Sequence, residues 1–273
     1  MKLKIFLLSL VFIFLPSSAF AFRITCSLFP VYEFTREIVK DEAEVNLLLK
    51  PGVEPHEFEP SPSDIKKLNN SDVFIFTGSN MEHWAEKISA SLNGVKIVEA
   101  SHGIEIINND PHVWLDLRNA QIMVKNIAAG LVEACPEKSE IFNKNAENYC
   151  FELSELDGKF EALNKNKTLV FAGKFAFNYF IGRYKFNYVS AYDGENEPSV
   201  KRVAEILRFI KENGVKFIFS DSDINPVARS IAGETGAEIL IFDPCENISD
   251  FNKALSFLEI MRKNYEAAHK AAE

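Results

Sequence analysis

The chain has 273 residues, and its 39 acidic against 30 basic residues give a formal net charge of −9 at neutral pH. This excess of negative charge repels a phosphate backbone, so the composition argues against a nucleic-acid-binding protein. Hydrophobic residues make up 47% of the chain, which is typical of an ordinary globular protein with room for one large domain or two medium ones.

The first 21 residues have the pattern of a secretory signal peptide. Two lysines precede an apolar run over residues 5–15, which is too short to span a bilayer, and the segment ends in Ala-Phe-Ala, which is typical of a cleavage site. The residues before Cys26 are not the small ones of a lipoprotein cleavage site. We therefore expect a protein that is exported to the periplasm without a lipid anchor.

Residues 22–136 alternate short β-rich runs with helical ones. Strands are predicted at Arg23–Phe29, Glu44–Leu49, Asp72–Thr77 and Lys96–Ala100, and helices near Val31–Lys40, from Ser63, near Glu82–Leu92 and near Arg118–Leu131. Such alternation is typical of right-handed βαβ units on a mostly parallel sheet. The sequence thus predicts an N-terminal α/β lobe over residues 22–136.

Residues 137–164 have a different, helical periodicity. Apolar residues recur at alternating spacings of four and three, at Phe142, Ala146, Tyr149, Leu153, Leu156, Phe160 and Leu163. This spacing predicts one amphipathic helix, whose ~28 residues at ~1.5 Å each would span roughly 40 Å. That length is enough to link one domain to another.

Residues 165–273 repeat the strand and helix alternation. Strands are predicted at Thr168–Ala172, Phe186–Ala191, Lys216–Ser220 and Glu238–Phe242, and helices near Phe175–Tyr184, Ser199–Asn213, Pro226–Glu234 and Ser249–Lys270. The whole chain is therefore predicted to be an α/β protein with two lobes of the (β/α)4 type, each with a parallel sheet, joined by the long helix.

One histidine stands in a stiff, proline-rich loop. The segment over residues 51–64 contains four prolines, and proline restricts both its own backbone and that of the preceding residue. His56 is therefore held in a defined position. A lone loop histidine is more often a turn residue than a ligand, so this motif alone is a weak signal.

A second histidine is presented in the same way. His112 follows a proline directly and stands between Asp110 and Asp116. His56 and His112 each follow a predicted strand, and ligands of parallel sheets bind outside the carboxyl ends of the strands. Imidazole is a common ligand of zinc and of several other divalent ions, so two such histidines predict a metal site.

These segments resemble the signature motifs of the zinc and manganese solute-binding proteins of bacterial ABC transporters. The similarity lies in Pro-Gly-Val-Glu-Pro-His-Glu-Phe-Glu-Pro-Ser-Pro-Ser-Asp, in Asp-Pro-His-Val-Trp-Leu-Asp, and in shorter matches through 176–180, 197–199, 234–236 and 242–244. The resemblance implies two lobes whose hinge motion is restricted by one helix. It also implies that the protein binds Zn²⁺ or Mn²⁺ in the cleft between the lobes and delivers the ion to an inner-membrane ABC permease. We expect a monomer.

The resemblance also implies a ligand from the second lobe. Asp243 ends the last predicted strand before a proline and matches the family's metal-binding aspartate. An aspartate there could equally be a turn residue. With His56 and His112 it would complete a mixed nitrogen and oxygen site of the kind that zinc or manganese accepts.

Lys174 is the place where the sequence departs from the family. It stands where other members carry a third ligand, a histidine in zinc binders and a glutamate or histidine in manganese binders. A protonated lysine has no lone pair and repels a dication. Three outcomes follow: Lys174 turns away and water fills the position, it binds the metal in neutral form, or the site has lost its metal function.

Other residues could supply the missing contact, namely Glu57, Glu59, His102, Asp221 and Cys245. His83 is predicted to be a surface or packing residue. The long histidine-rich insertion of several zinc-specific relatives is missing, which weakens the argument for zinc in particular. Cys26 and Cys245 are predicted near the cleft, where they could approach each other or the metal, or remain free buried thiols; a bridge between Cys135 and Cys150 is disfavoured by their separation along the helix.

The leading hypothesis is a periplasmic binding protein, not an enzyme, that captures a divalent metal for an ABC importer. One alternative is a zinc hydrolase in which His56 and His112 hold the metal and Glu57 acts as general base. Another is a degenerate member of the family that binds metal weakly or not at all and serves as an interaction protein.

Overall fold

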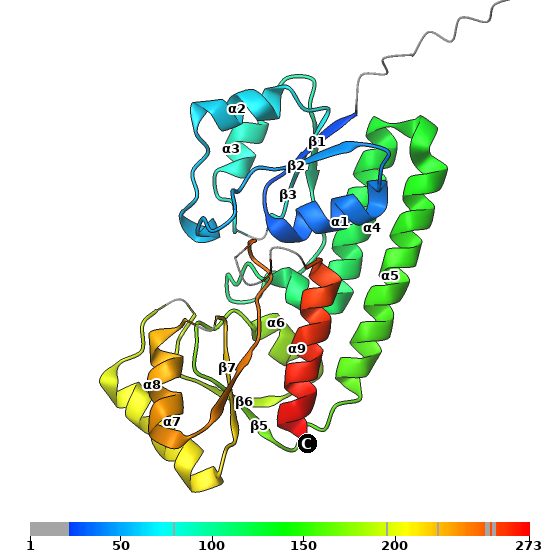
Figure 1. Ribbon diagram of the computed structural model, residues 1–273. Helices are drawn as coiled ribbons and strands as arrows, with labels where there is room; N and C mark the ends of the chain where they lie inside the picture. The colour runs from blue at the N-terminus through cyan, green and yellow to red at the C-terminus, as the bar shows by residue number, and fades with distance from the viewer. Residues whose placement is uncertain (1–21, 79, 195, 223, 249–251, 253–254) are drawn as a thin grey trace, which may run out of the picture.

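The computed structural model describes residues 22–78, 80–194, 196–222, 224–248, 252 and 255–273. Figure 1 shows two α/β lobes, one built from the first half of the chain and one from the second, with long helices beside them. This arrangement confirms the predicted fold class. The predicted signal peptide lies outside the described residues. Within the part of the chain that is described, no helix is both long enough and apolar enough to cross a membrane.

The N-terminal lobe contains a four-stranded parallel sheet in the order β2-β1-β3-β4. Its strands are β1 (Arg23–Cys26), β2 (Glu44–Leu47), β3 (Val73–Phe76) and β4 (Lys96–Glu99), and its helices are α1 (Phe29–Val39), α2 (Pro62–Asn69), α3 (Ala85–Ser89) and α4 (Leu117–Ala134). The central strand β3 is buried along its whole length. A strand that is covered on both faces reads as a continuous apolar run, as Val-Phe-Ile-Phe does here.

The C-terminal lobe repeats this topology in the order β6-β5-β7-β8. Its strands are β5 (Thr168–Phe171), β6 (Asn187–Ser190), β7 (Phe217–Ser220) and β8 (Glu238–Ile241), and its helices are α6 (Asn178–Tyr184), α7 (Val200–Asn213), α8 (Pro226–Thr235) and α9 (Phe257–Ala272). In each sheet the first and third strands along the chain are neighbours at the centre. The loops that follow them leave the sheet in the crevice where ligands of such folds bind.

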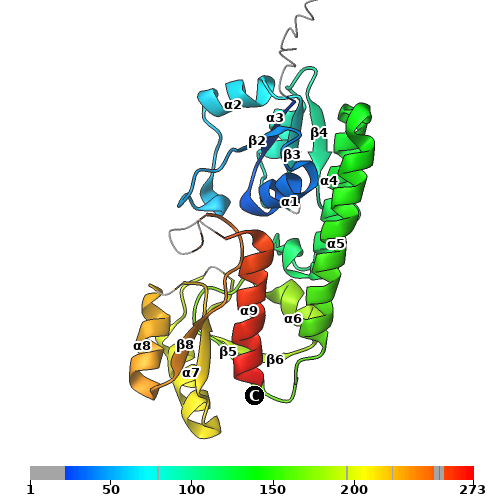
Figure 2. The ribbon, with the colours of Figure 1, turned by 45° about the vertical axis from the view of Figure 1, so that its right-hand side comes forward.

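A single long helix, α5 (Ser139–Glu161), runs beside both lobes (Figure 2). The prediction placed its start at residue 137, but Pro136–Lys138 form a separate 3-10 turn. The apolar stripe that predicted the helix is buried, with Phe142, Leu153 and Phe160 fully shielded from solvent. This stripe packs on α1, α4 and α9. The helix therefore belongs to the core and is not a flexible tether.

The C-terminal helix also links the two lobes. It begins at Phe257, after a capping box between Ser256 and Glu259; the start that the sequence predicted, Ser249, lies outside the described residues. The backbone N–H of Phe257 donates to the carboxylate of Glu33, a buried residue of α1 in the other lobe. The indole N–H of Trp114 donates across the lobes to the carbonyl oxygen of Pro244 at 2.8 Å. These contacts bring the loops of the two sheets together.

Candidate metal site

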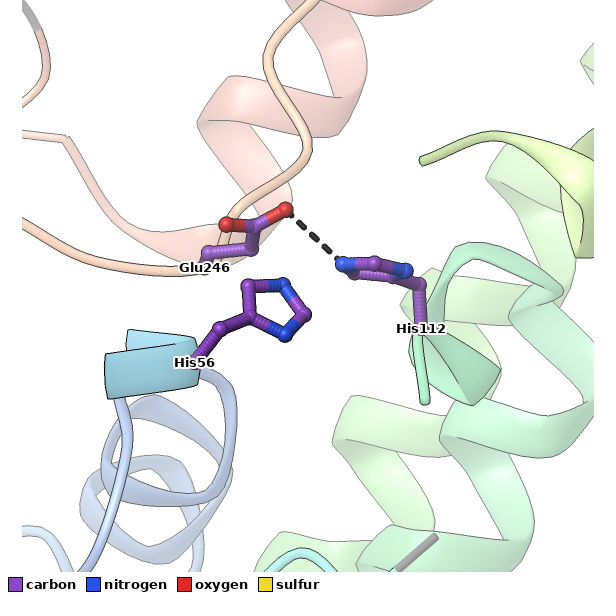
Figure 3. A group of neighbouring side chains, drawn as sticks. All are labelled: His56, His112 and Glu246. Atoms are coloured by element: carbon purple, nitrogen blue, oxygen red, sulfur yellow. Dashed lines mark ion pairs between the residues drawn. The ribbon is translucent and has the colours of Figure 1, made fainter. Parts of the chain in front are cut away.

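Three side chains converge between the lobes, from three loops that are far apart in the sequence (Figure 3). Among the described residues, His56, His112 and Glu246 form a group whose potential ligand atoms all lie within 4.8 Å of one another. The imidazole rings of His56 and His112 are 5.4 Å apart between centroids. His56 follows β2, His112 follows β4 and Glu246 follows β8, so each lobe contributes from the carboxyl edge of its sheet.

The local sequence fixes the position of His56. The 3-10 turn Pro55–Glu57 carries it, and the proline at the first position of this turn suits the fixed backbone angle that a helical turn needs. Glu54 caps the turn, because its side chain accepts a hydrogen bond from the backbone N–H of His56 at 3.4 Å. The Nε2 atom of His56 is buried and has no hydrogen-bond partner in the described structure.

His112 is oriented by Asp110, two residues earlier in the same loop. One carboxylate oxygen of Asp110 accepts from the backbone N–H of His112 at 2.9 Å and lies 2.7 Å from its Nδ1 atom. The other oxygen accepts from Asn178 of the C-terminal lobe at 2.7 Å. A carboxylate on Nδ1 holds the tautomer that leaves Nε2 available to a metal, which is a common arrangement around metal-binding histidines.

Glu246 completes the group from the second lobe. Its Oε1 atom lies 2.9 Å from Nε2 of His112, close enough for an ion pair, although the two groups are not aligned as a hydrogen bond. Both side chains are close to fully buried. Burial alone would lower the pKa of His112, but Glu246 and Asp110 outweigh it and raise this pKa to about 9. A proton on His112 thus balances the negative charge of the Glu246 and Asp110 carboxylates, as a bound metal dication would.

The structure brings together two of the three residues that the sequence assigned to the metal, His56 and His112, with Glu246 as the third member of the group. Asp243 lies outside the group, because its carboxylate accepts from the backbone N–H of Cys245 at 2.7 Å and from Asn252 at 3.0 Å. Glu246 was not singled out from the sequence. The available signal was a second carboxylate three residues after Asp243 in the same loop.

Lys174 does not join the group either. Its ammonium lies 3.6 Å from the carboxylate of Glu54, and its backbone N–H donates to Asp221 at 2.9 Å. A cavity of about 190 Å³ lies beside the group, and both Lys174 and Glu246 line it. The other lining residues are Glu54, Ala176, Asp221, Ser222, Asp243, Pro244, Asn247 and Asn252. The residue that the resemblance aligned with a third ligand therefore lies at the edge of the site, beside Glu54.

Of the residues that the sequence offered as auxiliary contacts, Asp221 lines the cavity beside the group without belonging to the group, and the others do not join it either. Glu57 and His102 are exposed, and Glu59 is exposed and forms an ion pair with His83 at 2.8 Å. Cys245 is fully buried and its thiol contacts the carbonyl oxygen of Asp243 at 3.7 Å. All four cysteines are free and buried, so Cys26 and Cys245 form no bridge.

Comparison with known proteins places the chain in a family. Residues 24–271 match the model of the ZnuA family, which is described as zinc-uptake complex component A, periplasmic. The high-affinity zinc uptake system protein ZnuA of Bacillus subtilis is 32% identical over 90% of this chain and 86% of that protein. The zinc-binding protein AdcA of Streptococcus pyogenes serotype M3 is 33% identical, but the chain spans only 55% of its length.

Solved structures agree with this match along nearly the whole chain. The Zn(II)-bound ZnuA-like domain of Streptococcus pneumoniae AdcA has a TM-score of 0.81 and 31% identity, covering 92% of this chain and 99% of that domain. The metal-dependent lipoprotein YcdH of Bacillus subtilis has a TM-score of 0.82 and 32% identity, with coverages of 92% and 98%. With its two parallel sheets, its long helix and the whole of residues 24–271 matched, the chain belongs to the ZnuA family.

Proposed function

We propose that this protein is the solute-binding component of a zinc uptake system. It would hold one zinc ion between His56, His112 and Glu246 and deliver it to an ABC permease in the inner membrane. The observation that carries the proposal is the convergence of two buried imidazole nitrogens and one carboxylate within 4.8 Å. Buried polar groups normally have partners, and the Nε2 atom of His56 has none among the described residues, which supports a bound cation at this point.

The donor set favours zinc and also accepts manganese. Zinc binds nitrogen and oxygen donors, and it is stable with three protein ligands and one water. Manganese prefers a larger number of oxygen donors, and this group offers one carboxylate. The names of the relatives, which refer to zinc, support the same choice. We therefore propose zinc as the transported ion and manganese as the weaker competitor.

The residues around the group favour a carrier over a catalyst. Glu57, which a hydrolase would need as a general base next to the metal, is an exposed residue and is not part of the group. The pattern of residues 1–21 supports export, and we propose that the mature protein acts as a monomer in the periplasm. A degenerate interaction protein without metal is not favoured, because the three potential ligand side chains converge.

The experiment is metal analysis of the purified mature protein. After chelation and reloading with zinc or manganese, we expect one equivalent of zinc, with much weaker retention of manganese. His112→Ala and Glu246→Ala should each reduce zinc affinity by at least a hundredfold, whereas His83→Ala, which changes an exposed histidine, should not. Less than a tenth of an equivalent of zinc in metal excess would refute the proposal. Hydrolysis of ester or peptide probes by the zinc-loaded protein would favour the enzyme alternative.

A further inference from the structure

Glu246 reaches the two histidines through an unusual turn. Cys245, the residue before it, has a φ of +58°, in the left-handed region. A side chain in this region costs roughly 1–2 kcal/mol, and mainly glycine, asparagine and aspartate adopt it. Because Glu246 follows directly, the backbone angles of Cys245 decide the direction in which the side chain of Glu246 leaves the chain. This strained residue therefore needs support from its surroundings.

The support comes from side chains that take the place of backbone partners. The carboxylate of Asp243 accepts from the backbone N–H of Cys245 at 2.7 Å, which closes the turn over Pro244. Asn264 of α9 accepts from the N–H of Asp243 at 2.9 Å and donates to its carbonyl oxygen at 2.8 Å. Trp114, two residues after His112, donates to the carbonyl oxygen of Pro244. The segment is thus fixed at three successive residues.

Asp243 itself is held in the orientation that this turn requires. Its second carboxylate oxygen accepts from Asn252 at 3.0 Å, and the residue is buried, with 8% of its surface exposed. Neutral hydrogen-bond donors therefore satisfy both carboxylate oxygens of Asp243. The carboxylate of Glu246 differs, because its partner in the group is the imidazole of His112. A carboxylate with this set of partners is equipped to hold backbone in place.

We propose that Asp243 is a positioning residue: it stabilises the left-handed turn at Cys245 and so directs Glu246 at His56 and His112. This inference rests on the proposed metal site and adds the reason why its third ligand is in place before metal arrives. A preformed ligand binds more tightly because the cost of ordering it has been met during folding. Loss of the turn should therefore weaken metal binding without removing a ligand.

The test is a rescue experiment at Cys245. Asp243→Ala should weaken zinc affinity by about tenfold or more, because the turn then exchanges with conformations that turn Glu246 away. In that background, Cys245→Gly should bind zinc about fivefold more tightly than Cys245→Ala, since both substitutions remove the thiol but only glycine adopts the left-handed region freely. Without the Asp243 change, the glycine and alanine variants should bind equally, because Asp243 locks the turn in both.

Two outcomes would overturn the inference. Equal zinc affinity of the glycine and alanine variants in the Asp243→Ala background would mean that Asp243 acts through its charge or as a ligand. The visible spectrum of bound Co²⁺, which depends on the ligand set, gives a second readout at saturation. It should be unchanged in the variant that combines Asp243→Ala with Cys245→Gly and altered in Glu246→Ala. A spectrum altered equally in both would identify Asp243 as a ligand.

This experiment separates the inference from the proposed function. If the unmodified protein binds no zinc, the proposed site is refuted, and the inference that rests on it is overturned as well. If it binds zinc, and His112→Ala and Glu246→Ala abolish binding, the site stands whatever the variants at Cys245 show. Thermal unfolding of each variant checks that the substitutions leave the protein folded.

Discussion

Replacing Lys174 by histidine should tighten zinc binding. Lys174 follows β5 and lines the same cavity as Glu246, at a position where its backbone N–H is fixed by Asp221. The close approach of this backbone to Asp221 depends on Gly173, because a Cβ atom at position 173 would meet the Asp221 carboxylate at 2.1 Å. The residue at 174 is therefore held at the edge of the site, and a ligand in this place would be presented to the metal.

The expected gain has two parts. A unit charge and a dication about 6 Å apart repel each other by ~1.4 kcal/mol in water, which is about tenfold in affinity. Glu54, 3.6 Å from the ammonium, offsets part of this repulsion, whereas the lower effective dielectric of a partly buried site strengthens it, so about tenfold is the gain expected from removal of the charge alone. Replacement of a bound water by an imidazole, which converts three protein ligands to four, should add at least another tenfold.

Lys174→Met separates the two parts, because it keeps the length of the side chain and removes only the charge. Zinc affinity should be measured by competition with a chelator of known strength, for the unmodified protein and both variants. We expect the order Lys174→His, then Lys174→Met, then the unmodified protein, from tightest to weakest. Weaker binding by both variants would show that Lys174 contributes to the site as a neutral ligand, and the reasoning would fail.

Three further outcomes follow from the described contacts. Because the pKa of His112 is raised to about 9, zinc must displace a proton from this residue near pH 7. Calorimetry in buffers of different ionisation enthalpy should therefore show the release of about one proton. The zinc affinity should rise as the pH increases towards 9. Zinc at ~100 times its Kd should stabilise the fold by ~2.7 kcal/mol, raising the melting temperature of the unmodified protein but not of His112→Ala. Burial raises the pKa of Glu82 from 4.5 to about 7, so the folded state keeps a proton that the unfolded state loses. The contribution of this protonated carboxyl to stability is complete below pH ~4.5, and about 3 kcal/mol is lost as the pH rises from ~4.5 to ~7. Denaturant titrations should show that Glu82→Gln removes this dependence.

Most of the fold could be predicted because the sequence patterns that indicate strands and helices are local. Each strand is a short apolar run between turn residues, and the stripe on α5 repeats over several turns, so the alternation alone predicted two similar lobes and a linking helix. The ends were less readable. The strand predicted at Arg23–Phe29 stops at Cys26, because the first turn of α1 already begins at Phe29 with a proline in its second position.

The two histidines could be predicted for a related reason. The prolines around His56 and the Asp-Pro before His112 are visible in the sequence, and both residues follow strands whose carboxyl ends meet at one edge. The ion pairs across the cleft could not be predicted, because they join residues that only the packing of the two lobes brings together. Glu54 and Lys174 are one such pair, separated by 3.6 Å in space but by 120 positions in the sequence.

The choice between Asp243 and Glu246 depends on how each buried carboxylate is compensated. Burial raises the pKa of Asp243 to about 6, and the hydrogen bonds from Cys245 and Asn252 partly offset this. Glu246 is also buried, yet its pKa is lowered, because the charges of His112, His56 and Lys174 outweigh the burial. Asp243, whose partners are neutral hydrogen-bond donors, is suited to holding the backbone of the turn. Glu246, whose neighbours are cationic groups, is suited to binding a metal cation in their place. Nothing in Asp-Pro-Cys-Glu distinguishes the two, since a cysteine gives no sign of the left-handed turn that separates them. A glycine at that position would have marked the turn and, with it, the ligand.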